Sequence, residues 1–143
     1  MGEARHVEAR WTGALAALAT ARDYEVPVDE PAAAGGDDSG MMPTELMLCA
    51  LASCFCLAVA HVAAKRDIEL PGLRVAVDAE RVGRELRYGR LRVEVATSAC
   101  EHDLDALVAR AKPFCWVSNM LSPELELTYA SVVLADPPPA DAG

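Results

Sequence analysis

A run of 19 residues without Lys, Arg, Asp or Glu, from Leu46 to Ala64, most constrains what this chain can fold into. It nearly reaches the ~20 apolar residues of a membrane span, which is one reading of it. It is, however, rich in small residues, and it contains Ser53 and His61. No Trp or Tyr marks its ends, as interface residues do in membrane spans. We therefore interpret it as a helix buried on all sides, which a small domain can achieve by pairing with a second copy.

The composition limits the classes of partner and the cellular compartment. The 143 residues are 52% hydrophobic and suffice for one domain with a real core. Thirteen basic residues against 22 acidic ones give a net charge of −9, which argues against binding to nucleic acid or to an anionic membrane. The N-terminal residues lack the layout of a secretory signal, so we expect a cytoplasmic protein with reduced thiols. Five cysteines without a CxxC pair argue against a disulfide framework or a zinc ribbon.

Local patterns predict an alternation of strands and helices along the chain. Pro43 fits the first turn of a helix, and Asp103 is placed to cap another. Apolar residues alternate in the strand-like segments and recur at helical spacing in the second helix. The expected strands cover 6–13, 24–28, 73–82, 85–97 and 124–134, and the expected helices cover 43–66 and 101–112.

This order, β-β-α-β-β-α-β, predicts an α+β fold in which a long central helix packs against an antiparallel sheet. We expect residues 1–135 to form a single domain. The segment 136–143, "DPPPADAG", is expected to be a disordered tail.

Helix geometry argues against a metal site in the central run. Cys54 and Cys56 are two residues apart, about 200° around the helix axis, so they point to opposite faces. Cys49 and Cys56 share a face but lie on the order of 10 Å apart. Packing as small hydrophobic side chains is the simplest role for Cys49, Cys56 and Cys100. The same role is open for Cys54, because a thiol in the middle of a helix gains nothing from the helix N-terminus.

Two stretches give Cys54 a second reading. They are "PTELMLCALASCF" at 43–55 and "ARAKPFCWVS" at 109–118, and "RWTG" at 10–13 precedes them. Together they resemble the OsmC/Ohr family of thiol-dependent peroxidases. The matched features are a proline and a glutamate that open a long helix, a small-small-Cys-Phe step within it, and a later Ala-Lys…Cys-x-Val-Ser turn.

The resemblance implies an OsmC-like fold in an intertwined homodimer, with the two central helices between β-sheets. It implies that Cys54 is the peroxidatic thiol and Cys115 the resolving thiol, with Glu45 a candidate for the glutamate that supports thiol activation. The substrate would be an organic hydroperoxide and the reductant an external dithiol. Neither cofactor, metal, nucleic acid nor membrane would take part. The apolar residues near these cysteines, Phe55, Leu57, Phe114, Trp116 and Met120, are candidate walls or plain core.

The sequence departs from the family pattern at the activating groups. Thr44 stands where the peroxidases have the glutamate, and Glu45 follows one position later. The family's arginine matches an uncharged stretch, so Arg22 is the nearest replacement in the sequence. Arg10 and an arginine of a second copy are further candidates. Trp116 replaces the usual proline of the Cys-Pro-Val-Ser turn.

Two main functions are therefore carried forward. The first is a hydroperoxide reductase that acts through a Cys54 sulfenic acid and a Cys54–Cys115 disulfide. The alternative is a redox-sensing or ligand-binding module of the same fold without significant turnover. Ser118 and His61 suggest a hydrolase only weakly, because there is no G-x-S-x-G step and no aspartate stands out to orient the histidine.

Overall fold

The computed structural model describes residues 4–134, which belong to two compact units. The first unit ends at Met47 and the second begins at Leu48. Whether residues 1–135 behave as a single domain therefore stays a prediction. The predicted tail, 136–143, lies outside the described residues.

The first unit contains a three-stranded antiparallel sheet with strand order β1-β2-β3. The strands are β1 (Glu8–Gly13), β2 (Ala16–Ala21) and β3 (Tyr24–Asp29). The sequence predicted β1 and β3 but not β2, whose letters "AALATA" neither alternate nor contain a β-branched apolar residue. β2 is a strand because it pairs on both sides: Ala19 lies opposite Ala9 of β1 and Val26 of β3.

Asp29 organises the loop that leads from β3 into the long helix. Its carboxylate accepts backbone N–H groups from Glu30 at 2.8 Å, Asp37 at 3.2 Å and Ser39 at 3.1 Å, and the Ser39 hydroxyl at 2.7 Å. The hydrogen bonds from Ser39 hold the pKa of this buried carboxyl below its usual value. The loop contains the 3₁₀ helix η1 (Ala32–Ala34), and Met41 then forms a bridge with Val28 just before the helix begins.

The second unit is built on the sheet β4-β5-β6. The strands are β4 (Arg74–Arg81), β5 (Tyr88–Thr97) and β6 (Glu126–Val133). β4 and β5 form the predicted antiparallel hairpin, whereas β6 runs parallel to β5, a departure from the antiparallel sheet that we expected. The reason is the helical connection between β5 and β6, which returns the chain to the starting end of the sheet and so allows parallel pairing.

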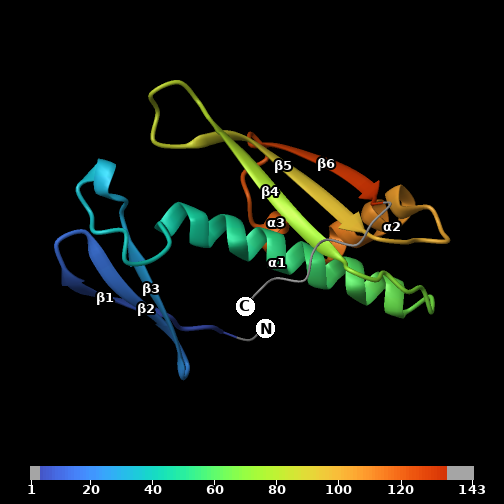
Figure 1. Ribbon diagram of the computed structural model, residues 1–143, viewed down its shortest axis with the longest axis horizontal. Helices are drawn as coiled ribbons and strands as arrows, with labels where there is room; N and C mark the ends of the chain where they lie inside the picture. The colour runs from blue at the N-terminus through green and yellow to red at the C-terminus, as the bar shows by residue number, and fades with distance from the viewer. Residues whose placement is uncertain (1–3, 135–143) are drawn as a thin grey trace. The chain divides into compact units, whose positions relative to one another are not determined.

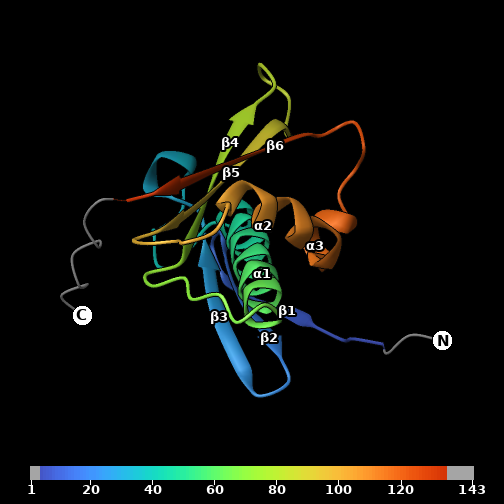
Figure 2. The same ribbon diagram turned by 90° about the vertical axis from the view of Figure 1, so that its right-hand side faces the viewer.

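Helices α1 (Pro43–Ala64) and α2 (Leu104–Ala111) lie on the same face of this sheet, as Figures 1 and 2 show. That face presents Leu91, Val93 and Val95 of β5, which are buried, while the neighbouring Arg90 and Arg92 face outward. Burying the apolar stripe of each helix against this face supplies the main driving force for folding of the unit. The buried α1 residues are Leu51, Phe55, Ala58, Val59, Val62 and Ala63.

Among the described residues, part of the α1 surface is exposed. By length and composition the helix could cross a membrane, and 33% of its most apolar window is buried. One such helix is weak evidence for a span, because core helices meet the same criteria. Leu57 is 71% exposed and Met47 42% exposed, so an apolar surface of α1 is open in the single chain.

Candidate functional site

Cys54 and Cys115 belong to one hydrophobic cluster in the second unit. Cys115 is fully buried within the cluster, and the partly buried Cys54 packs against it. The two residues are 61 positions apart in the sequence. The fold therefore brings both sequence-predicted cysteines to the same core, on α1 and on the segment that follows α2.

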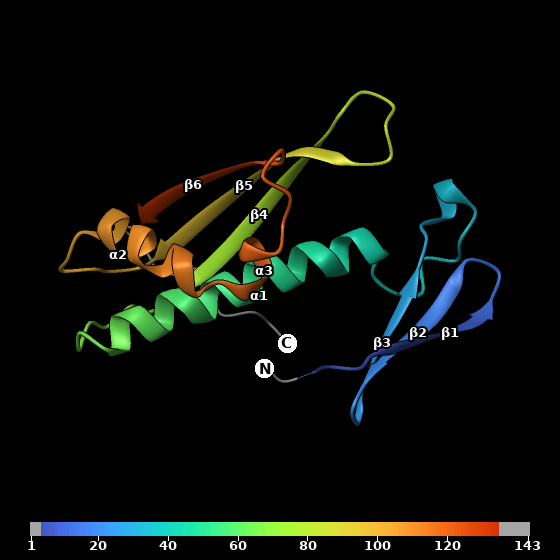
Figure 3. The same ribbon diagram turned by 180° about the vertical axis from the view of Figure 1, so that it is seen from behind.

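Local hydrogen bonds explain how Cys115 is placed. The Asp103 carboxylate caps α2 by accepting the backbone N–H of Ala106 at 3.3 Å, as the sequence predicted. After α2 comes a tight turn, η2 (Lys112–Phe114), and the Cys115 N–H donates to the Lys112 carbonyl oxygen at 3.3 Å. The short helix α3 (Trp116–Asn119) follows. In Figure 3 this whole segment runs beside α1.

Tyr129 of β6 is a member of this neighbourhood that the sequence analysis missed. Its ring lies against Phe55, with centroids 5.1 Å apart, and Lys112 Nζ sits 4.3 Å from the ring centroid. Burial raises the pKa of Tyr129, and charge on Cys115 raises it further. Tyr129 stands two residues after Leu127 in an alternating strand, which is the pattern of an ordinary core residue. No sequence signal therefore distinguished it from the rest of the core.

The other cysteines occupy different settings. Cys56 has a free thiol whose pKa burial raises, which suits a packing role. The Cys100 thiol donates to the His102 carbonyl oxygen at 3.2 Å, in the loop before α2. Cys49 is exposed, so the expectation that it packs as a buried hydrophobic residue is wrong for the single chain.

Glu45 serves the start of α1. Its carboxylate accepts the backbone N–H of Met42 at 3.3 Å, so it caps the first turn and also complements the helix dipole. Glu45 belongs to the first unit and precedes Cys54 by nine residues. On a regular helix this separation is about 13 Å along the axis and half a turn around it, so the two side chains point to opposite faces.

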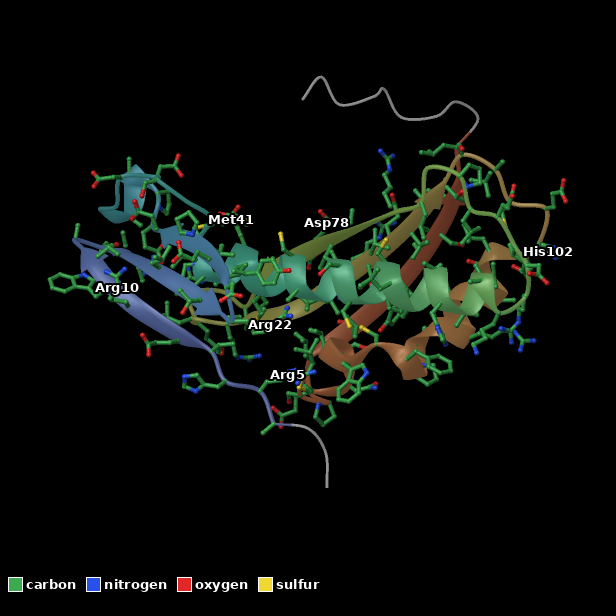
Figure 4. All side chains as sticks on the ribbon, turned by 90° about the horizontal axis from the view of Figure 1, so that it is seen from below. Arg5, Arg10, Arg22, Met41, Asp78 and His102 are labelled. Carbon is green, nitrogen blue, oxygen red and sulfur yellow. The ribbon has the colours of Figure 1, made fainter. Side chains whose placement is uncertain are left out.

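The two arginines named by the sequence also belong to the first unit. Arg22 lies at the β2–β3 turn, where its guanidinium stacks over the Tyr24 ring at 4.9 Å. Arg10 lies on β1 opposite Leu18. Figure 4 shows the two arginines well apart, so they do not form one basic cluster.

The apolar residues proposed as walls divide into two groups. Phe55 is fully buried and is a core residue, whereas Leu57, Phe114, Trp116 and Met120 are all exposed. Of the two roles that the sequence left open for Leu57, packing in the core does not apply to the single chain, where this side chain is 71% exposed. The exposed group comes from α1 and the segment after α2, the same two elements that carry Cys54 and Cys115.

The side chains suggested for a hydrolase do not work together. The His61 ring packs against Phe114, with centroids 5.5 Å apart, while the Ser118 hydroxyl donates to the Cys115 carbonyl oxygen at 3.1 Å. Within residues 4–134, no group of three or more His, Cys, Asp or Glu side chains is arranged to hold a metal ion.

A comparison with protein families decides the classification. The family described as OsmC-like protein matches residues 36–130, which is most of the chain and includes both cysteines. The chain belongs to the OsmC family.

Solved structures of OsmC and Ohr proteins share the fold at low sequence identity. An OsmC-like protein from Mycoplasma pneumoniae has a TM-score of 0.75 and 16% identity, with 94% of this chain and 99% of that chain covered. The organic hydroperoxide resistance protein OsmC from Legionella pneumophila has a TM-score of 0.70 and 20% identity, with 92% and 98% covered. The organic hydroperoxide resistance protein OhrB of Bacillus subtilis has a TM-score of 0.65 and 24% identity, with 91% and 98% covered. A search of curated proteins found no match.

At these identities the solved structures establish the OsmC fold of this chain and leave its activity open. The predicted family and the predicted α+β architecture with a long helix are thereby confirmed.

Proposed function

We propose that this OsmC protein is a thiol-dependent hydroperoxide reductase in which Cys54 is the peroxidatic and Cys115 the resolving cysteine. The observation that supports this most is that Cys115 lies in the hydrophobic core of the second unit and Cys54 packs against the same core. Two thiols in one core can be joined once local movement brings their Cα atoms to the ~4.4–6.8 Å of a disulfide.

The reaction consists of three steps. The Cys54 thiolate attacks the terminal oxygen of ROOH, the O–O bond breaks, and the alcohol ROH leaves with a proton while Cys54 becomes a sulfenic acid. The Cys115 thiol then displaces the sulfenic hydroxyl, which forms a disulfide and water. An external dithiol reduces the disulfide by two exchange steps and regenerates both thiols.

The surroundings favour an organic hydroperoxide over hydrogen peroxide. The exposed side chains of Leu57, Phe114 and Trp116 lie on the two elements that carry the cysteines. They offer apolar contact area to an alkyl or aryl group, which hydrogen peroxide lacks. We place this activity in the cytoplasm, where dithiol reductants are available.

We also propose that the working form is a homodimer. Most of α1 outside the core face is apolar, and Leu57 and Trp116 are exposed at 71% and 79%. A second copy would cover this surface, and such surfaces on soluble proteins commonly mark protein interfaces.

A redox-sensing module is the second candidate, and the contacts of Glu45 and Arg22 support it. Glu45 caps α1 through Met42, and Arg22 stacks on Tyr24. Both groups that could support thiol activation thus have local partners in the first unit. A thiol without such support would oxidise slowly, which suits sensing better than detoxification.

The test is consumption of cumene hydroperoxide with dithiothreitol as reductant. We expect turnover by the wild type, loss of turnover in Cys54→Ser, and wild-type turnover in the control Cys100→Ser. Cys115→Ser should form a sulfenic acid that dimedone traps. Turnover that survives Cys54→Ser would refute the assignment, and oxidation of Cys54 without turnover would favour the sensing module.

A further inference from the structure

Tyr129 contacts the residue that follows Cys54 and a residue of the turn that leads to Cys115. On one side its ring packs against Phe55, which directly follows Cys54 on α1. On the other side Lys112 Nζ lies over the same ring at 4.3 Å from the centroid. Lys112 precedes Cys115 by three residues and accepts the Cys115 N–H through its carbonyl oxygen.

Ser118 closes the turn that carries Cys115. Its hydroxyl donates to the Cys115 carbonyl oxygen at 3.1 Å. Lys112 and Ser118 stand three residues before and three residues after Cys115, and Lys112 contacts the Tyr129 ring.

Burial raises the pKa of Tyr129, so the phenol stays neutral at physiological pH while its ring packs against Phe55.

We infer that Tyr129 is a positioning residue for the closure of the Cys54–Cys115 disulfide: it holds the turn that carries Cys115 against α1. The inference rests on the proposed function only through the pairing of these two cysteines. In the closing step the Cys115 sulfur attacks the Cys54 sulfur, the S–O bond of the sulfenic acid breaks, and hydroxide leaves with the Cys115 hydrogen as water. Cys115 is oxidised and the Cys54 sulfenic acid is reduced.

These contacts matter because the rate of an intramolecular attack depends steeply on geometry. A misplacement of about 1 Å can lower such a rate by about 100-fold. The Tyr129 ring contacts Phe55 of α1 and Lys112 of the turn, so it restricts movement of the turn relative to α1. Lys112 is mostly exposed, and its contact with the ring is of the cation–π type, worth about 0.5–1 kcal/mol at an exposed site.

The experiment measures closure without any peroxide. In the full chain carrying Cys49→Ser, Cys56→Ser and Cys100→Ser, excess Ellman's reagent first converts Cys54 to a mixed disulfide and releases one coloured thiolate. The Cys115 thiolate then attacks the Cys54 sulfur, the bond to the aryl sulfur breaks, and a second coloured thiolate leaves. The rate of the first phase depends on reagent concentration, and the rate of the second does not.

We expect Tyr129→Leu, which removes the ring, to slow the second phase about tenfold, and Tyr129→Phe, which keeps the ring and its contacts with Phe55 and Lys112, to leave the second phase nearly unchanged. The first phase should be unchanged in both. Tyr88→Phe is the matched control, because Tyr88 also packs partly buried against the same cluster, and it should leave both phases unchanged. Attack of a small external thiol on the same Cys54 adduct in a Cys115→Ser chain provides the intermolecular reference rate.

A second phase of equal rate in the parent chain and in Tyr129→Leu would overturn the inference. So would the absence of a second phase in the parent, because the pair would then not close. Failure of the proposed function is distinguishable: it would leave the second phase intact while cumene hydroperoxide is not consumed.

Discussion

The Phe55 and Tyr129 rings pack with centroids 5.1 Å apart and planes inclined at 45°, which joins α1 to β6 beside the two cysteines. Phe55 is completely buried. Replacing it with alanine removes a large apolar side chain and leaves a cavity, so we expect Phe55→Ala to lower the free energy of unfolding by about 4 kcal/mol. Denaturant unfolding measures this. Leu86→Ala, at a residue 98% exposed, should change it by no more than about 0.5 kcal/mol, and equal effects would contradict this packing.

The titration of Tyr129 provides a second prediction. Its pKa is raised above 10.0, the ordinary value for tyrosine, mainly by burial and also by charge on Cys115. Stability from the neutral phenol is therefore complete below about pH 10 and is lost as pH rises through the folded-state pKa. We expect the unfolding free energy to fall in that alkaline range, and less so in Tyr129→Phe.

Absorbance at alkaline pH, as the difference between wild type and Tyr129→Phe, isolates the ionisation of this phenol. Cys115→Ala removes the nearby negative charge, so the midpoint should move to lower pH. A midpoint that does not move in Cys115→Ala would contradict an effect of this charge on Tyr129.

Most of the fold could be predicted because its strong elements have strong local signals. Pro43 opens α1, Asp103 caps α2, and β4 and β5 alternate regularly. β2 could not be predicted, since a run of alanines becomes a strand only through partners on both sides. Likewise, the sequence of β6 does not state its direction relative to β5, which the helical connection determines.

The cysteines of the site were predictable only through their surrounding motifs. Periodicity alone did not favour a catalytic role for Cys54 over a packing role. Cys115 became a candidate because of the sequence of the turn in which it stands. Tyr129 could not have been found, because its role depends on Phe55 and Lys112, which come from two other segments. Non-local contacts of this kind leave no trace in a single sequence.

Asp29 supplies a prediction for acid conditions. Its pKa is held below 3.8, chiefly by the Ser39 hydroxyl, so the stability it contributes is complete above that pH and is lost as pH falls through the lower folded-state value. We expect Asp29→Asn to be less stable than wild type near neutral pH, with a difference that shrinks below about pH 3.8. Denaturant unfolding over a pH series measures it. Asp38→Asn makes the same change at an exposed position of the same loop and should show no such pH-dependent difference.

The open face of α1 leads to a prediction about assembly. Its exposed small and apolar residues recur at helical spacing: Ala50, Ser53, Leu57, Ala60 and Ala64. If a second copy covers this face, Leu57→Glu buries a carboxylate on each side of the interface, at a cost of about 3 kcal/mol or more without a partner. The dissociation constant should then rise by at least about 100-fold.

Sedimentation equilibrium distinguishes the outcomes for this face. We expect the mass of two copies for the wild type and for Leu86→Glu, whose site is exposed on the β4–β5 connection, and the mass of one copy for Leu57→Glu. A wild type with the mass of one copy would show that α1 does not pair. Extraction that requires detergent would instead favour the membrane reading of the same apolar run. Because Leu57 lies outside the cluster that holds Cys115, Ellman's second phase should persist in Leu57→Glu if the cysteines pair within one chain.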